Sequence, residues 1–193
     1  MRIVGGRLSG RRFSGPRSDA TRPTSERVRE AVGSALEARG LIEDAVVLEL
    51  FAGTGAMAFE ALSRGARRAI LVEKARPVAK AIEKSAAELG LADRVTVVTA
   101  DLERSAATWL EAIDEPAQLV LIDPPYARID LVPDLLTALA EAGRLEDGST
   151  VVVEHAQKHP PTMPLGFAEV SRYRYGDTAV WLARFTASEG THA

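Results

Sequence analysis

The stretch VVLELFAGTGAMAFEAL, residues 46–62, decides the fold, because it joins a strand to a helix through a glycine loop. Residues 46–50 form a largely apolar run typical of a strand buried on both faces, and a helix is predicted near 55–64. Gly53 and Gly55 let the backbone turn sharply and approach a ligand beside the free N–H groups of a helix start. On its own, the GxGxxA pattern also fits a plain tight turn.

The alternation of strands and helices continues along the chain. Further strands are predicted at 69–73, 95–99, 118–123 and 150–154, and further helices near 77–89, 104–113 and 130–141. Strands without polar alternation must be covered on both faces, which predicts a parallel sheet with helices on each side. Residues 167–176 and 178–185 alternate around Gly176-Asp177, so an antiparallel hairpin should end the sheet. The predicted architecture is a doubly wound α/β fold.

Two acidic residues follow the next predicted strands. Glu73 comes 20 residues after Gly53 and is placed to accept both ribose hydroxyls of an adenosine-containing ligand. Asp101, beside Leu102, is expected to face the adenine amino group or to cap a helix near Glu103, and the two roles are compatible. These residues fit a nicotinamide cofactor and S-adenosylmethionine equally well.

The predicted strand at 118–123 ends in Asp123-Pro124-Pro125-Tyr126, which resembles the [ND]PP[YF] motif of amino methyltransferases. The Asp123 carboxylate and the Pro124 carbonyl can accept the N–H bonds of a nucleobase amine and turn its lone pair toward a methyl donor. The two prolines hold that carbonyl, and Tyr126 can stack on a flipped-out base, a contact worth about 1–3 kcal/mol. The alternative is a rigid proline turn with Tyr126 packed.

Charge is distributed unevenly along the chain. Residues 1–29 hold eight arginines against two acidic residues, a formal +6 that leaves −9 on the rest of a chain of net charge −3. A basic arm on an acidic body suits a surface that meets a polyanion, although a solvated extension has the same composition. Residues 1–16 are predicted as a small β-ribbon or loop and 17–23 as irregular, followed by a helix from Thr24 or Ser25 to about residue 39.

Composition excludes several classes of protein. The chain has no cysteine and its three histidines lack metal-ligand spacing, so neither disulfides nor a metal site are predicted. There is no secretory signal and no run near the roughly 20 apolar residues that span a bilayer, so a cytoplasmic location without a membrane is expected. At 193 residues and 46% apolar content the chain fits one medium α/β domain.

These segments together resemble the bacterial RsmD family, the 16S ribosomal RNA guanine-N2 methyltransferases, over nearly the full length of the chain. The most specific of them is the RPT-x-x-RVRE run. The resemblance rests on RIVGGRLSGRRF (2–13), RPTSERVREAV (22–32), LELFAGTGAMAFEALSRGA (48–66), VEK (72–74) and DPPY (123–126). One departure is Gly33-Ser34, where the family pattern has a Phe-Asn pair.

The resemblance implies a class I S-adenosylmethionine-dependent methyltransferase fold, which is Rossmann-like, with a mostly parallel seven-stranded sheet and a C-terminal antiparallel hairpin. Residues 1–40 are expected to form a basic, RNA-facing appendage, 41–187 the methyltransferase domain and 188–193 a frayed tail. The implied cofactor contacts are Phe51, Gly53, Gly55, Glu73, Asp101, Leu102 and Asp123, and the implied catalytic residues are Asp123, Pro124, Pro125 and Tyr126. The implied RNA contacts are Arg2, Arg7, Arg11, Arg12, Arg22, Thr24 and Arg27.

The implied reaction is methyl transfer from S-adenosylmethionine to a guanine N2 amine of 16S rRNA, in an assembling or assembled small subunit, by a monomer. An adenine-N6 nucleic-acid methyltransferase also fits DPPY, but the chain has no evident room for a DNA-recognition domain. A nucleotide-dependent oxidoreductase would leave DPPY and the hairpin unexplained. A non-catalytic RNA-binding or assembly factor would not need the intact set of Gly53, Gly55, Glu73 and residues 123–126.

Overall fold

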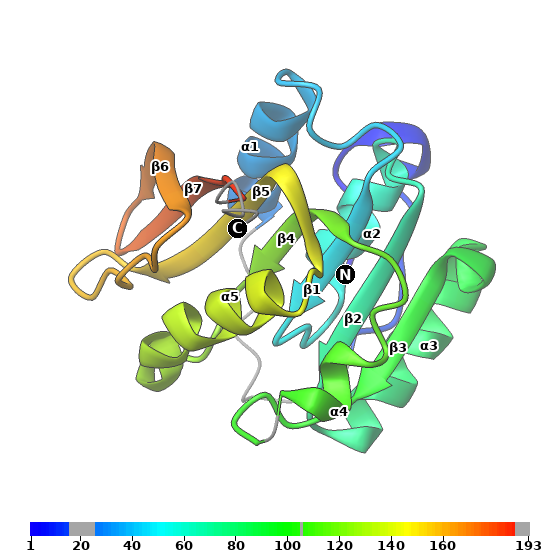
Figure 1. Cartoon of the computed structure of the whole chain (residues 1–193). Helices are drawn as coiled ribbons and strands as arrows, with labels where there is room; N and C mark the ends of the chain where they lie inside the picture. Colours follow the sequence, from blue (N-terminus) through cyan, green and yellow to red (C-terminus); the bar gives the residue numbers. More distant parts are fainter. Residues whose placement is uncertain (16–25, 105, 188–193) are drawn as a thin grey trace.

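The structure is a computed structural model that describes residues 1–15, 26–104 and 106–187 (Figure 1). Its sheet has seven strands in the order β3-β2-β1-β4-β5-β7-β6. The strands are β1 (Val46–Leu50), β2 (Arg68–Glu73), β3 (Val95–Thr99), β4 (Ala117–Ile122), β5 (Leu145–Ala156), β6 (Phe167–Tyr175) and β7 (Thr178–Phe185). Strands β1 to β5 are parallel, and β7 pairs antiparallel with both β5 and β6. The predicted sheet and its C-terminal hairpin are confirmed.

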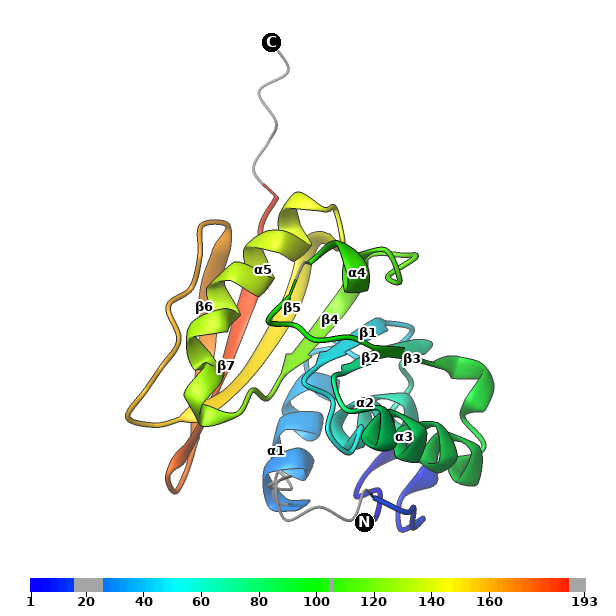
Figure 2. The same cartoon turned by 90° about the horizontal axis from the view of Figure 1, so that it is seen from below.

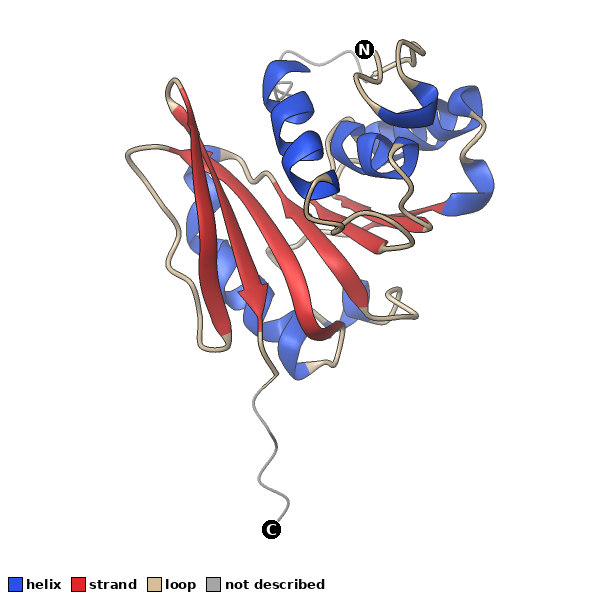
Figure 3. Ribbon diagram, turned by 90° about the horizontal axis from the view of Figure 1, so that it is seen from above, coloured by secondary structure: helices blue, strands red, loops and turns tan. Residues whose placement is uncertain are grey.

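Helices cover both faces of the sheet, as Figures 2 and 3 show from opposite sides. On one face lie α1 (Glu26–Glu37), α2 (Ala56–Ser63) and α3 (Arg76–Leu89), and on the other α4 (Ala107–Leu110) and α5 (Val132–Glu141). Short 3₁₀ helices are η1 (Gly6–Leu8), η2 (Ala92–Arg94) and η3 (Tyr126–Leu131). Alternate residues of each inner strand enter different cores, which explains the continuous apolar runs. No helix of the described residues is both long and apolar enough to cross a membrane.

Two predicted element lengths differ from the structure. The helix expected at 104–113 is only the four-residue α4, because the chain first turns at Asp101, whose carbonyl accepts the Arg104 N–H at 3.0 Å. Strand β5 extends beyond the predicted 150–154 at both ends, because Leu145 pairs with Ala117 of β4 at its start and β7 pairs along it as far as Ala156. The predicted cap at Thr24 or Ser25 lies outside the described residues.

The N-terminal ribbon, residues 1–15, is packed onto the main core. Its two arms meet at an antiparallel bridge between Arg2 and Arg12, as the glycine-rich turns predicted. Phe13 is buried and packs edge-on against Phe59 of α2, with ring centroids 5.2 Å apart. The ribbon therefore shares the core under α1, α2 and α3, while its predicted role toward RNA stays a prediction.

Buried charges lie beneath this ribbon. Glu60 of α2 is buried and accepts the Val4 N–H at 2.7 Å. The Arg64 side chain, only 5% exposed, pairs with Glu37 and lies 3.9 Å from Glu60. A Cβ atom built on Gly33 would come within 2.7 Å of the Arg64 Nε atom. The departure from the family pattern at Gly33 therefore leaves the space that the Arg64 guanidinium fills.

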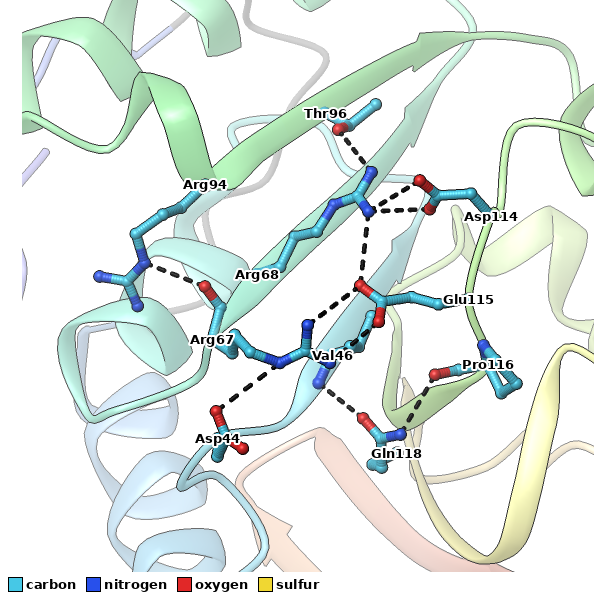
Figure 4. A network of polar contacts seen from close by, with 10 residues as sticks. All are labelled: Asp44, Val46, Arg67, Arg68, Arg94, Thr96, Asp114, Glu115, Pro116 and Gln118. Atoms are coloured by element: carbon cyan, nitrogen blue, oxygen red, sulfur yellow. Dashed lines mark hydrogen bonds and ion pairs between the residues drawn. The ribbon is translucent and has the colours of Figure 1, made fainter.

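A network of ion pairs links the segments at the amino-terminal ends of the parallel strands (Figure 4). Arg67 pairs with Glu115 at 2.9 Å and with Asp44 at 3.6 Å, and Arg68 pairs with Asp114 at 2.9 Å. Asp114 and Glu115 belong to the segment that leads into β4, so the network holds the start of β4 close to the start of β2.

Gly33→Ala should lower the free energy of unfolding by about 1–3 kcal/mol, because the added methyl group overlaps the buried Arg64 side chain. In an Arg64→Ala background this overlap is gone. Gly33→Ala should then be neutral or stabilising by up to about 1 kcal/mol, because Ala favours the helix more than Gly does. Denaturant unfolding of the four proteins gives the double-mutant cycle. Equal costs in both backgrounds would show that the two residues do not compete for this space.

Candidate active site

A cavity of about 490 Å³ opens at the carboxyl ends of the parallel strands. It spans the point where the strand order reverses between β1 and β4, the place where doubly wound sheets bind ligands. All predicted catalytic and cofactor-binding residues except Gly55 line it: Phe51, Gly53, Glu73, Asp101, Leu102, Asp123, Pro124, Pro125 and Tyr126. The sheet thus brings together residues that the sequence places after four different strands.

The glycine loop between β1 and α2 is built from left-handed backbone. Phe51, Gly53 and Gly55 have φ values of 56°, 53° and 70°. Left-handed backbone is unusual for a residue with a side chain, so Phe51 marks a strained position beside the cavity. Gly55 instead precedes α2, where an added Cβ would lie 2.9 Å from Leu71. Gly55 therefore lets α2 pack closely on β2, whereas Gly53 borders the cavity.

The carboxylate of Glu73 lies against the glycine loop. Its Oε2 atom accepts the Gly53 N–H at 2.9 Å and its Oε1 atom accepts the Ala75 N–H at 2.8 Å. A carboxylate offers about four acceptor positions, so two further hydrogen bonds from a ligand can be accommodated. The loop and the acid, 20 residues apart in sequence, therefore form one wall of the cavity.

Asp101 takes part in a chain of ion pairs at the cavity rim. It pairs with Lys74 at 3.0 Å, which holds the pKa of the Asp101 carboxyl below its usual value. It also accepts the Glu103 N–H at 3.1 Å, but the next helix starts only at Ala107, so the predicted role as a helix cap is wrong and the side chain closes a turn. Glu103 pairs with Arg128 at 2.9 Å, which joins the segments after β3 and β4.

The Asp123–Tyr126 motif forms the wall next to the glycine loop. Pro124 is buried, and Pro125 has extended backbone with its carbonyl accepting the Arg128 N–H at 2.7 Å. The Asp123 side chain is half-buried, and Tyr126 is 45% exposed at the edge of the cavity. The arrangement presents a carboxylate, a rigidly held backbone and an aromatic ring side by side.

The sequence analysis missed five charged residues that line the cavity: Glu49, Lys74, Glu103, Arg128 and Glu154. In all, the lining has six carboxyl groups against two basic side chains, which favours a cationic ligand. Within the described residues no group of three or more acidic or histidine side chains could hold a metal ion. A signal existed for both glutamates, because Glu49 interrupts an otherwise apolar predicted strand and Glu154 ends another.

Glu49 is buried behind the glycine loop, where its Oε2 atom accepts the Ala58 N–H of the first turn of α2 at 3.0 Å. Burial raises the pKa of this carboxyl to about 8, the Ala58 hydrogen bond opposes the shift, and the nearby charge of Asp123 adds to it. A carboxyl group in this state can hold or release a proton near neutral pH.

Two of the predicted RNA-binding arginines make contacts within the protein. Arg2 pairs with Glu26 at 2.8 Å. Arg11 donates to the carbonyls of Glu88 and Leu89, each at 2.9 Å, at the C-terminal end of α3. The side chains of Arg7, Arg12 and Arg27 are exposed, whereas Arg22 and Thr24 lie outside the described residues. Arg11 thus anchors the ribbon to α3.

Comparison with known proteins gives consistent results. The family model described as conserved hypothetical protein 95 matches residues 1–184. The chain is 36% identical over 169 residues to ribosomal RNA small subunit methyltransferase D of Escherichia coli (strain K12), covering 87% of this chain and 81% of that protein. The solved structure titled "Putative methyltransferase yhhF from Escherichia coli" superposes with a TM-score of 0.80 at 32% identity, covering 97% of this chain and 99% of that one.

Glu49→Gln should change how stability depends on pH. The folded-state pKa of about 8 exceeds the ordinary 4.5, so between these values the folded protein binds one proton more than the unfolded chain. The protonated carboxyl contributes its full stabilisation below the unfolded-state pKa of 4.5. As pH rises from there toward the folded-state pKa, the free energy of unfolding falls by on the order of 1 kcal/mol per pH unit. Gln cannot ionise, so denaturant unfolding from about pH 5 to about pH 8 should increasingly favour the variant. A difference that stays constant with pH would contradict the raised pKa.

Proposed function

Because the chain belongs to the family described as conserved hypothetical protein 95, which confirms the resemblance to the RsmD family, we propose that it methylates the N2 amine of a guanine in 16S rRNA with S-adenosylmethionine. One observation carries this proposal: Asp123-Pro124-Pro125-Tyr126 opens into the same cavity as the glycine loop and Glu73. The similarity to a protein named ribosomal RNA small subunit methyltransferase D supports rRNA as the substrate.

The cavity fits S-adenosylmethionine in volume and charge. Its volume of about 490 Å³ lies within the range usual for small-molecule sites. When bound, S-adenosylmethionine supplies an electrophilic methyl group on a cationic sulfonium, and the acidic lining suits that charge. Glu73 would accept the ribose hydroxyls, Asp101 would face the adenine, and Phe51, Gly53 and Leu102 would border the rest of the molecule.

The motif at the end of β4 would prepare the target amine. An exocyclic amine is a poor nucleophile because its lone pair is delocalised into the base. The Asp123 carboxylate and the Pro124 carbonyl would accept its two N–H bonds, which favours a pyramidal nitrogen with a directed lone pair. The proton that the amine loses would pass to Asp123 or to water, and Tyr126 would stack on the flipped-out base.

The N-terminal ribbon would position the enzyme on rRNA phosphates without reading the base. Of the predicted contacts, the exposed Arg7, Arg12 and Arg27 suit this role best, because Arg2 and Arg11 also make contacts within the protein. Contacts of Arg22 and Thr24 with RNA remain an expectation from the resemblance, because both lie outside the described residues. We expect a metal-independent monomer in the cytoplasm that modifies an assembling or assembled small subunit.

The decisive experiment is transfer of a radiolabelled methyl group from S-adenosylmethionine to 16S rRNA, free and in small subunits from cells that lack this gene. Nucleoside analysis should recover the label as N2-methylguanosine. Absence of label on either RNA, from protein that still binds the cofactor, would refute the proposed acceptor.

Asp123→Ala should retain cofactor binding but lose methylation in this assay, because the amine then lacks its carboxylate acceptor. Asp123→Asn is the matched control: its carbonyl oxygen can still accept an N–H bond, so part of the activity should remain. Cofactor affinity of both variants can be measured by calorimetry. Full methylation activity of Asp123→Ala would contradict the proposed role of this residue.

Arg12→Ala should weaken RNA binding and reduce the slope of log affinity against log salt by about one, the contribution of one phosphate contact. Arg184→Ala is a control with the same charge change, because Arg184 is exposed on β7 opposite Thr150, toward the amino ends of the parallel strands. Affinity for 16S rRNA should be measured over a range of salt concentrations. If both variants have the wild-type slope, the ribbon does not contact phosphates through Arg12.

A further inference from the structure

Glu154 lies on β5 directly beside the catalytic motif. Ile122 of β4 pairs with Val153 of β5 in parallel register, and adjacent strands lie about 4.8 Å apart, so the residues that follow, Asp123 and Glu154, come next to each other. Strand β4 ends at Ile122, but β5 continues to Ala156. Glu154 therefore stands on a regular strand next to the point where β4 gives way to the Asp123 motif.

Glu154 and Asp123 also face the same way. Along β4 and β5, Leu121 and Val152 belong to the core under α1, α2 and α3, and side chains of a strand alternate between faces. Asp123 and Glu154, two residues further on, project to that same face, and both line the cavity. On its other side Glu154 pairs with Val180 of β7, so the β5–β7 ladder fixes its backbone.

A flipped guanine has two kinds of donor side by side on its Watson–Crick edge, the N2 amine and the adjacent N1–H. If the amine lies at Asp123 and Pro124, as the proposed function requires, N1–H is the next group along that edge. We propose that Glu154 is a specificity-determining residue whose carboxylate accepts the N1–H of the target guanine. This assignment rests on the proposed function and adds a reader of the base to the groups that act on its amine.

The same carboxylate rejects adenine. In adenine the ring nitrogen next to the exocyclic amine is unprotonated, so its lone pair would face the Glu154 carboxylate without a hydrogen between them. A site built to accept a hydrogen bond discriminates strongly against an analogue that cannot donate it, because both groups are then left unpaired. Glu154 thus separates guanine-N2 from adenine-N6 chemistry at a cavity whose DPPY motif fits both.

The test uses a base that keeps the target amine but lacks the N1–H, because a 6-amino group replaces the guanine 6-carbonyl. 2,6-Diaminopurine carries the same 2-amino group, but its N1 is an acceptor. Once the methylated position is mapped, 16S rRNA is assembled by ligation with either guanine or 2,6-diaminopurine at that position, and kcat/KM is measured on both. The wild-type protein should prefer guanine by about tenfold or more. Glu154→Gln, whose amide can donate to an unprotonated N1, should reduce this preference by a similar factor.

Glu141→Gln is the matched control, because it removes one carboxylate from the exposed C-terminal end of α5 and should keep the wild-type preference. Thermal unfolding and cofactor binding confirm that each variant is folded. An unchanged preference in a folded Glu154→Gln protein overturns the assignment. Equal wild-type activity on the two bases also overturns it, without need of a variant. Failure of the wild-type protein to label guanine at all refutes instead the proposed function on which the assignment rests.

Discussion

The register of β4 between β1 and β5 is the constraint on which the site depends. Ile122 is opposite Leu50 on one side and Val153 on the other, so the three strands deliver their ends to one edge of the sheet. Because side chains alternate, a slip of one residue in β4 would turn Asp123 toward α4 and α5 and away from the cavity. The apolar residues of β4, packed into cores on both faces, set this register and thereby the direction of the Asp123 carboxylate.

The same register collects acidic side chains. Glu49, Asp123 and Glu154 lie on one face of three adjacent strands, and repulsion from Asp123 contributes to the raised pKa of the buried Glu49 carboxyl. A cationic ligand relieves this repulsion, whereas a neutral one does not. Methyl transfer turns a sulfonium into a neutral thioether, so on the proposed function the acidic lining favours the substrate form of the cofactor over its product. The carboxylates that line the cavity would therefore favour release of the product, which has lost the sulfonium charge.

Local patterns predicted the fold well, because strands, glycine turns and the Gly176-Asp177 hairpin each have their own signal in sequence. The helix at 104–113 failed because Arg104, its predicted first residue, closes the turn at Asp101, so the regular helix begins only at Ala107. Glu154 was not predicted as a site residue because only the register between β4 and β5 brings it next to Asp123. That register cannot be read from either segment alone. Contacts such as that of Arg11 with Leu89, 78 residues away, lie beyond any local pattern.

The basic arm shows how composition overstates a charged surface. Of the eight arginines in residues 1–29, three that the structure describes have partners or burial within the protein: Arg2 pairs with Glu26, Arg11 binds the end of α3, and Arg29 is buried. Each phosphate contact contributes about 0.7–0.9 to the slope of log affinity against log salt concentration. Eight contacts would give a steep slope, and we expect a shallower one because several of these arginines already have partners within the protein. On the proposed function, RNA binding should depend on few phosphates and draw more on the flipped base and the shape of its surroundings, a demand that the proposed contact of Glu154 with the base would meet.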